Sequence, residues 1–327
     1  MDFKYGKKVS SEFLEDKLEW DKDNYWKKVS WKIGKNAKQK IHQCPICNSK
    51  KASKFFGWYG YSYVQCSKCS LLYANRRLTH EESISFYSDD DDYNADYIYT
   101  SKKYLKEREK IIQPKIDFIK KYVKGKNWLD IGSADGAAIQ VLNKLGYKAL
   151  GIEISKKSRD FSKKYRKIEL YPKPLEEFEV ENTKKWNAVS IIGVMDVIPN
   201  PFEILKISNR LLDKNGIIAL NVPNYDSVST AVQMMLKEPD RHLGNDIMRA
   251  YNLKSLKFGL RKAGFEPIAA WYFGMDSIEL LRYIRQLNKK FINSKIDKIL
   301  RLKINEIQQV FDEAQLGDQI LIIGRKR

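Results

Sequence analysis

The sequence predicts an α/β protein in which strand–helix units repeat along a largely parallel sheet. An apolar run at 128–131 ends in a glycine-punctuated turn, and the apolar positions of the next segment have helical spacing. A second short run follows at 149–153, and Ser155 can cap the helix after it. Two further apolar stretches lie within 186–201 and 216–224. Strands that alternate with helices in this way are typical of a parallel sheet covered by helices.

Length and charge set the broad class of the chain. At 327 residues it is long for one domain, which suggests a main domain with additions. The formal charge of +19 fits a nucleic acid or an acidic membrane surface, but Lys and Arg alternate with Asp and Glu, so a general coding bias explains it better. No apolar stretch approaches the ~18 residues that span a bilayer. The polar start at 1–8 has no signal-peptide core, so we expect a cytoplasmic protein.

The four cysteines form two C-x-x-C pairs, Cys44 with Cys47 and Cys66 with Cys69. Each pair can offer two thiolates from a tight turn, and the segment between them is long enough for a hairpin that joins the pairs into a tetrahedral site. Reduced structural thiols or disulfides are the alternative, and a cytoplasmic chain disfavours disulfides. We therefore expect zinc. Four thiolates leave no position open for water, so the zinc should be structural.

The turn after the first strand is suited to a nucleoside. Gly132 and Gly136 let the backbone approach a ligand where a Cβ would collide, and the next helix start offers unpaired N–H groups. Glu153 ends the second strand, so its carboxylate can accept hydrogen bonds from two ribose hydroxyls. Ala134 and Ala137 stand where a dinucleotide fingerprint needs glycine, which disfavours NAD. A glycine turn alone is also a common tight turn, but the two acids in register favour the nucleoside.

This arrangement of acids and glycines resembles the class I S-adenosylmethionine-dependent methyltransferases. The resemblance covers about residues 42–325 and implies a Rossmann-like sheet of seven strands, the last one antiparallel. It implies S-adenosylmethionine as the cofactor, with Glu153 holding the ribose. The family usually has glycine where this chain has Ala134, whose small side chain is tolerable. The residues expected along the methionine and ribose are Asp130, Gly132, Ser133, Ala134, Asp135 and Gly136.

Residues 64–77 resemble the N-terminal zinc-ribbon segment of one group of these methyltransferases. A helical, tyrosine-rich connector follows there, and 81–97 looks similar, which implies that Tyr87, Tyr93 and Tyr97 line an acceptor pocket. The acidic run 89–92 fits a solvated loop better than a cation site. We expect an N-terminal extension (1–41), a zinc ribbon (42–78), a helical connector that caps the acceptor (79–124) and a cofactor-binding domain (125–327) with helical insertions around 225–262 and 276–315.

The remaining elements follow from local pattern and the same resemblance. The charged stretch 102–124 should form a helix on the first strand, and 167–171 should form a short third strand. Leu175 follows that strand, where the adenine usually lies in the family, although a core role is equally consistent. A helix is expected at 252–262, a sixth strand at 264–273 and the last strand at 318–324.

The fourth-strand loop and the segment before 252 carry the catalytic candidates. Many relatives have a Glu-His pair in this loop where the chain has Asp196-Val197, so the acid is kept and the imidazole is absent. The resemblance also places Gly193 beside the cofactor. His242 precedes a segment that resembles the family's lid, where a His-Leu pair often faces the acceptor. Asp196 and His242 are thus the candidates for a base, and a surface or interhelical role is the alternative for His242.

Three functions compete. The first is a methyltransferase acting on a small polar acceptor such as a sugar nucleotide or a surface-glycan or secondary-metabolite precursor, a substrate class that comes only from the resemblance. The second is an RNA methyltransferase, because a zinc ribbon and a basic chain can hold phosphates. The loop 193–196 lacks the Pro-Pro-aromatic element that grips a flipped base, which argues against it. The third is a non-catalytic scaffold that binds the cofactor for stability.

Overall fold

A seven-stranded sheet is the centre of the computed structural model, which describes residues 1–19, 37, 39–58, 61–89, 102–236, 243 and 248–327. The strand order is β1-β12-β13-β10-β9-β7-β8. β13 runs antiparallel to both of its neighbours, and the other pairs are parallel. The expected sheet with an antiparallel last strand is confirmed. The strands are β1 (Asp2–Tyr5), β7 (Asn127–Ile131), β8 (Lys148–Ile152), β9 (Trp186–Ile192), β10 (Leu212–Pro223), β12 (Phe265–Phe273) and β13 (Gln319–Lys326).

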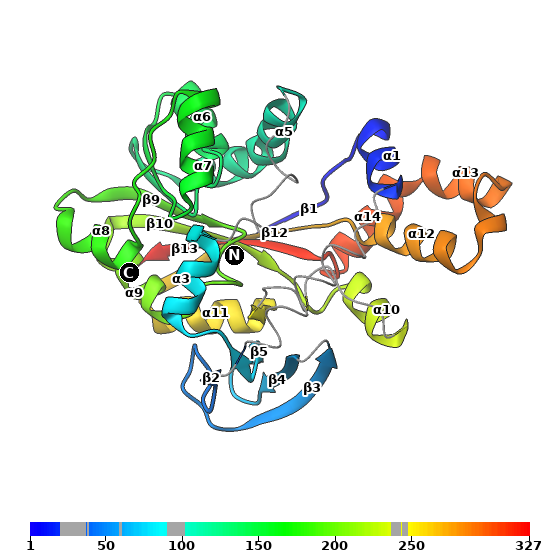
Figure 1. Cartoon of the computed structure of the whole chain (residues 1–327), viewed down its shortest axis with the longest axis horizontal. Helices are drawn as coiled ribbons and strands as arrows, with labels where there is room; N and C mark the ends of the chain where they lie inside the picture. Colours follow the sequence, from blue (N-terminus) through cyan, green and yellow to red (C-terminus); the bar gives the residue numbers. More distant parts are fainter. Residues whose placement is uncertain (20–36, 38, 59–60, 90–101, 237–242, 244–247) are drawn as a thin grey trace.

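Helices cover both faces of this sheet (Figure 1). On one face lie α5 (Lys102–Ile119), α6 (Ala137–Lys144) and α7 (Lys156–Phe161). The other face carries α9 (Pro201–Leu211) and α11 (Leu253–Lys262), with α8 (Leu175–Glu181) beside α9. Ile116 and Ile119 of α5 are fully buried against Trp128 of β7, so the helix expected at 102–124 packs on the first strand as predicted.

The third strand expected at 167–171 is wrong. Only Tyr171 pairs, as an isolated parallel bridge to Ile152 of β8. Lys167 has a left-handed backbone, φ 59°, and ends a π-helical turn (Ser162–Arg166). Pro172 and Pro174 then follow, and proline has no N–H to extend a ladder. The seventh position is filled instead at the opposite edge by β1, which runs parallel to β12.

A second sheet is built around the cysteines, in the segment 42–78 that we call the ribbon. Its order is β11-β5-β4-β3, with β3 (Ala52–Trp58), β4 (Tyr61–Cys66), β5 (Leu72–Ala74) and β11 (Arg249–Ala250). β11 comes from the expected insertion at 225–262, so a distant segment extends the ribbon sheet. β2 (Gln39–Lys40) and β6 (Arg76–Arg77) form a separate two-stranded sheet. The helix α3 (His80–Asp89) follows, at the start of the expected connector.

The expected helical insertion at 276–315 extends the far end of the molecule (Figure 1). It contains α12 (Asp276–Leu287), a 3-10 turn (Lys289–Phe291), α13 (Lys295–Leu302) and α14 (Ile304–Glu313). α1 (Ser11–Glu19) packs on α12 through Leu14, Ile278 and Leu281. α10 (Val228–Leu236) also contacts α12. Within the described ranges, no helix has both the length and the apolar composition to cross a membrane.

Candidate functional site

The loop after β7 is held in a tight left-handed path. Gly132, Ala134 and Gly136 have φ angles of 73°, 46° and 77°. The N–H groups of Gly132 and Ser133 both donate to the carbonyl of Ile152 at 2.9 Å. A Cβ on Gly132 would lie 2.4 Å from Val194 Cγ2, and one on Gly136 would lie 2.4 Å from Ser162 Oγ. Glycine is therefore required at both positions, by conformation and by space.

Asp130 is the second-last residue of β7, directly before this loop. Its side chain is buried, and its carboxylate accepts hydrogen bonds from Ser190 Oγ at 2.5 Å and from Ser133 Oγ at 2.9 Å. Burial raises the pKa of Asp130 to about 6, against the opposing effect of the two hydroxyl donors. The carboxyl thus ties the loop to β9, the neighbouring strand.

Glu153 follows β8 and faces the same loop. Its Oε2 accepts the N–H of Ala134 at 2.8 Å, and its Oε1 accepts the N–H of Ser155 at 2.7 Å. Burial raises the pKa of Glu153, although the two backbone donors oppose the shift. Each carboxylate oxygen has a second lone pair, so the group can still accept two hydroxyl donors from a ligand. The structure therefore brings Glu153 onto the glycine loop.

Asp135 plays a different part from its neighbours in the loop. Its carboxylate is fully buried and pairs with Arg166, whose Nε lies 3.1 Å from Oδ2. Arg108 Nε lies 3.8 Å from the other oxygen. Since Arg166 ends the π-helical turn, this ion pair joins the loop to the segment behind it. The buried Asp135 side chain therefore anchors the loop to the π-helical turn through Arg166.

Two further residues expected at the cofactor lie near the same sheet edge. Leu175 begins α8 and is 3% exposed, in one cluster with Phe178, which fits the core role that the sequence left open. Gly193 follows β9 with φ 70°, and its N–H donates to the carbonyl of Asn221 on β10. A Cβ at Gly193 would meet no atom within 4 Å, so open space borders the loop there.

The loop after β9, which carries Asp196, is clamped by the ribbon sheet. The backbone carbonyl of Asp196 accepts the N–H groups of Met248 at 3.0 Å and of Arg249 at 3.2 Å. The Arg249 guanidinium is buried and donates to the carbonyls of Met195, Ile198 and Pro199. Because Arg249 belongs to β11, the strand added to the ribbon sheet, the ribbon fixes the path of this loop.

Two more side chains reinforce the clamp. Tyr251 donates from its hydroxyl to the carbonyl of Met195 at 3.0 Å. Arg77, in β6, donates to the carbonyl of Pro199. Burial, together with the nearby charge of Arg249, lowers the pKa of Arg77 to about 10. Sequence reasoning missed Arg77, Arg249 and Tyr251, since they recognise carbonyl groups of a distant loop and no local motif marks them.

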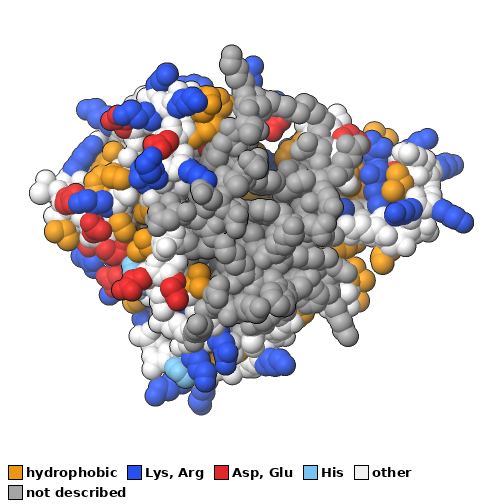
Figure 2. All heavy atoms as spheres, in the orientation of Figure 1, with side chains coloured by type: hydrophobic (Ala, Val, Ile, Leu, Met, Phe, Trp, Pro, Cys, Tyr) orange, Lys and Arg blue, Asp and Glu red, His pale blue; other side chains and the backbone are white. Residues whose placement is uncertain are grey.

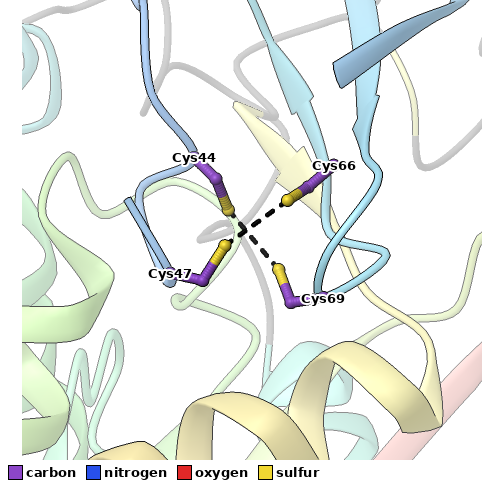
Figure 3. A group of neighbouring side chains, drawn as sticks. All are labelled: Cys44, Cys47, Cys66 and Cys69. Carbon is purple, nitrogen blue, oxygen red and sulfur yellow. Dashed lines mark hydrogen bonds between the residues drawn. The ribbon is translucent and has the colours of Figure 1, made fainter. Parts of the chain in front are cut away.

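The four cysteine sulfurs converge on one point (Figure 3). All four lie within 4.8 Å of one another and are buried, with Sγ–Sγ distances of 3.5 Å between Cys44 and Cys69 and 3.4 Å between Cys47 and Cys66. Four sulfurs at about 2.3 Å from a tetrahedral ion would be separated by about 3.8 Å, so the set fits a metal of that size. The hydrogen bond from the Cys69 thiol lowers the pKa of Cys44 below its usual value.

The two cysteine turns share one backbone pattern. In each turn the first cysteine accepts an N–H from the residue four positions on, and its own N–H donates to the carbonyl five positions on. Asn48 and Ser70, which follow the second cysteine of each pair, have left-handed φ angles of 60° and 63°. The sequence correctly predicted that the two cysteine pairs come together.

A polar network joins the ribbon to the loop after β10. The Tyr225 hydroxyl donates a hydrogen bond at 2.6 Å to the carbonyl of Ser70, the residue directly after Cys69. The same hydroxyl accepts from Gln65 Nε2 at 3.0 Å and from Asn252 Nδ2 at 2.8 Å. Asn252 also caps α11, with the Ser255 N–H donating to its side chain at 2.9 Å. The cysteine turns therefore contact the carboxyl end of the main sheet.

The residues expected at the acceptor are Tyr87, Tyr93, Tyr97 and His242. Tyr87 lies in α3, while Tyr93, Tyr97 and His242 lie outside the described residues. Leu243, the neighbour of His242, is buried with Leu78, Tyr225 and Ala250 between the ribbon sheet and the loop after β10.

The chain is similar to several known proteins. A family model described as a methyltransferase domain matches residues 104–270, just over half of the chain. No curated protein sequence matches. Similar solved structures include an S-adenosylmethionine-dependent methyltransferase from Archaeoglobus fulgidus, at 17% identity and a TM-score of 0.48, covering 69% of this chain and 100% of that one.

Two others contain S-adenosylhomocysteine. The plantazolicin methyltransferase BamL has 14% identity and a TM-score of 0.49, covering 75% of this chain and 94% of that one. Magnesium protoporphyrin IX methyltransferase from Synechocystis PCC 6803 has 12% identity and a TM-score of 0.44, covering 74% and 97%. The family model, together with the sheet order and its antiparallel β13, leads to one conclusion: the chain belongs to the class I S-adenosylmethionine-dependent methyltransferases.

Proposed function

We propose that this methyltransferase binds S-adenosylmethionine on the loop 130–136 and transfers its methyl group to a small polar acceptor, such as a sugar nucleotide or a surface-glycan or secondary-metabolite precursor. The observation that carries the cofactor site is the contact of Glu153 with the Ala134 N–H at 2.8 Å. It brings the second acid onto the glycine loop at the carboxyl edge of a parallel sheet, where ligands of such sheets bind.

The cofactor supplies an electrophilic methyl group on a sulfonium, so the protein's task is alignment. Gly132 and Gly136 let the loop turn where a Cβ would collide with Val194 or Ser162, and Glu153 orients the ribose. Asp130 fixes the loop through Ser133 and Ser190. Positioning of the acceptor for in-line attack and exclusion of water supply most of the rate enhancement.

A base is needed only for an acceptor hydroxyl or carbon acid of low acidity. Asp196 and His242 are the candidates that the sequence offers, and Tyr87, Tyr93 and Tyr97 are proposed to line the acceptor pocket. Asp196 is supported by its place directly beyond β9, on the edge that also carries the glycine loop. His242 rests on the family resemblance.

We also propose that Cys44, Cys47, Cys66 and Cys69 bind one structural zinc. Four buried thiolates would complete a tetrahedral coordination sphere, which leaves no site for substrate or water. The metal would then act by shaping the ribbon, which contacts the loop of Asp196 through β11.

Calorimetric titration with S-adenosylmethionine tests the cofactor site. Glu153→Ala should weaken binding by roughly tenfold to a hundredfold, because two hydrogen bonds to the ribose are lost. Glu153→Gln keeps one acceptor oxygen and should lose less. Glu169→Ala, an exposed glutamate paired with Lys163, is the matched control and should bind normally. Normal affinity in both Glu153 variants would place the ribose elsewhere.

The acceptor can be identified by incubating the protein and labelled S-adenosylmethionine with metabolite pools and with structured RNA, followed by mass spectrometry. A labelled small molecule would support the proposal and name the methylated atom. Label in RNA would favour the RNA enzyme. Cofactor binding without transfer to any pool would favour a scaffold.

A further inference from the structure

The helical end of the molecule presents an unusual concentration of exposed apolar side chains. Of the large hydrophobic residues exposed in the described ranges, five lie between 287 and 302. Three of these belong to α13. They are Leu287 at 73% exposure, Ile292 at 41%, Ile296 at 60%, Ile299 at 49% and Leu302 at 76%. We call this set the α13 face.

The α13 residues of this face form one stripe. Ile296, Ile299 and Leu302 are spaced three apart, so they follow one side of the helix. The opposite side of the helix packs against the rest of the protein. There Asp297 is fully buried and accepts two hydrogen bonds from Arg285, both at 2.8 Å. Asp297 also accepts the Asn293 N–H. Packing thus fixes the orientation of the helix and points the apolar stripe outward.

Cations surround the stripe. Residues 287–303 contain five lysines and one arginine, and Asp297, which pairs with Arg285, is their single acid. The lysines are all exposed. Figure 2 shows Lys and Arg side chains around hydrophobic ones on this protruding end. The cations are Lys289, Lys290, Lys295, Lys298, Arg301 and Lys303, of which Arg301 pairs with Glu15 and Lys303 pairs with Glu306.

An apolar stripe bordered by lysines matches the surface of an anionic bilayer, in which acyl chains lie beneath acidic headgroups. A second copy of this face would oppose the same cations to one another, which disfavours self-association. We propose that the α13 face docks the protein on an anionic membrane surface, with Ile296, Ile299 and Leu302 entering the headgroup layer.

Sedimentation of the full chain with lipid vesicles tests this. Vesicles of phosphatidylcholine with about a third phosphatidylglycerol should bind the protein at least roughly tenfold more tightly than phosphatidylcholine alone. Ile296→Ser/Ile299→Ser/Leu302→Ser should lower that binding at least roughly tenfold, as should Lys295→Glu/Lys298→Glu. Because all five side chains are exposed, the variants should fold normally, which circular dichroism can verify.

The matched control changes exposed apolar residues elsewhere. Val180→Ser/Met235→Ser alters side chains of 86% and 82% exposure on α8 and α10 and should bind vesicles as the unmodified chain does. Equal binding to neutral and anionic vesicles would overturn the proposal. So would unchanged binding by the triple serine variant, or a dimer in analytical ultracentrifugation that this variant abolishes.

Discussion

Ala134 shows how a single residue departs from the family pattern and what the departure costs. Its φ of 46° lies in the left-handed region, which glycine adopts freely and alanine does not. The family usually has glycine here. The sequence therefore indicated the site of the departure, but only the backbone shows that the alanine is strained.

Ala134→Gly should stabilise the protein by up to about 1 kcal/mol, since relief of left-handed strain exceeds the added entropy of the unfolded chain. Denaturant unfolding without ligand would measure it. Ala138→Gly, the same substitution inside α6, is the control and should destabilise by about 1 kcal/mol. A loss of stability in both variants would show that Ala134 is not strained.

Asp276, Asp312 and Asp318 are buried near the end of β12 and the start of β13. Their carboxyl groups form a pH-dependent cluster. Asp312 and Asp276 each accept a hydrogen bond from Gln308 Nε2, and Asp276 also accepts the Asp318 N–H at 2.9 Å. Burial, and then the charges of Asp276 and Asp318, raise the pKa of Asp312 to about 8. The folded state therefore retains a proton that the unfolded state releases near pH 4.

Stability should consequently fall as pH rises from about 4 to 8, with Asp312 contributing up to about 1.4 kcal/mol per pH unit. Asp312→Asn keeps the shape and removes the titration, so its unfolding free energy should be flatter between pH 6 and 8. Asp297→Asn is the contrasting control. The hydrogen bonds from Arg285 lower the pKa of Asp297, so this carboxyl is already charged between pH 6 and 8. The variant should therefore be less stable than the unmodified chain, while its unfolding free energy changes with pH as steeply. Parallel profiles for Asp312→Asn and the unmodified chain would contradict the assignment.

At the scale of elements, the sequence predicted what local pattern encodes. Strands β7, β8, β9, β10, β12 and β13 were each marked by an apolar run, and the cysteine spacing marked the four-cysteine cluster. The strand at 167–171 failed because Pro172 and Pro174 stop the ladder after one bridge. β1 and β11 are short and are recognised only through partners far away in the sequence. Long-range pairing of this kind has no local signature.

The pairing of β11 with β5 gives the proposed zinc a testable consequence. Protein purified without added zinc should contain about one equivalent, which Cys66→Ser/Cys69→Ser should remove. Amide exchange at 193–200 should then accelerate, because Met248, Arg249 and Arg77 hold that loop from the ribbon side. The affinity for S-adenosylmethionine should change little, since Asp130 and Glu153 are anchored on the main sheet.

Ser67→Ala, between the same two cysteines, should retain the metal and the slow exchange. If the double-serine variant lacks metal but its amides at 193–200 exchange as slowly as in the unmodified chain, then the metal does not stabilise this loop and the proposed coupling is refuted.

For the whole molecule, the charge of +19 raises the question of an RNA substrate. An RNA enzyme that neutralises six or more phosphates should lose roughly a thousandfold in affinity between 50 and 200 mM salt. We expect only weak binding of structured RNA by fluorescence anisotropy, with no methyl transfer into it. Tight, salt-sensitive binding accompanied by transfer would replace the small acceptor with RNA.

The position of β13 ties the order of synthesis to the integrity of the fold. It is the last strand of the sheet to be translated, yet it lies between β10 and β12. β1 pairs with a strand whose residues follow more than 260 codons later. At about 5–20 residues per second, β1 waits roughly 15–50 s for β12. Until β13 is made, the β8–β7–β9–β10 part and the β1–β12 part have no strand between them, so a stop codon that removes all of Gln319–Lys326 would leave the sheet in two pieces.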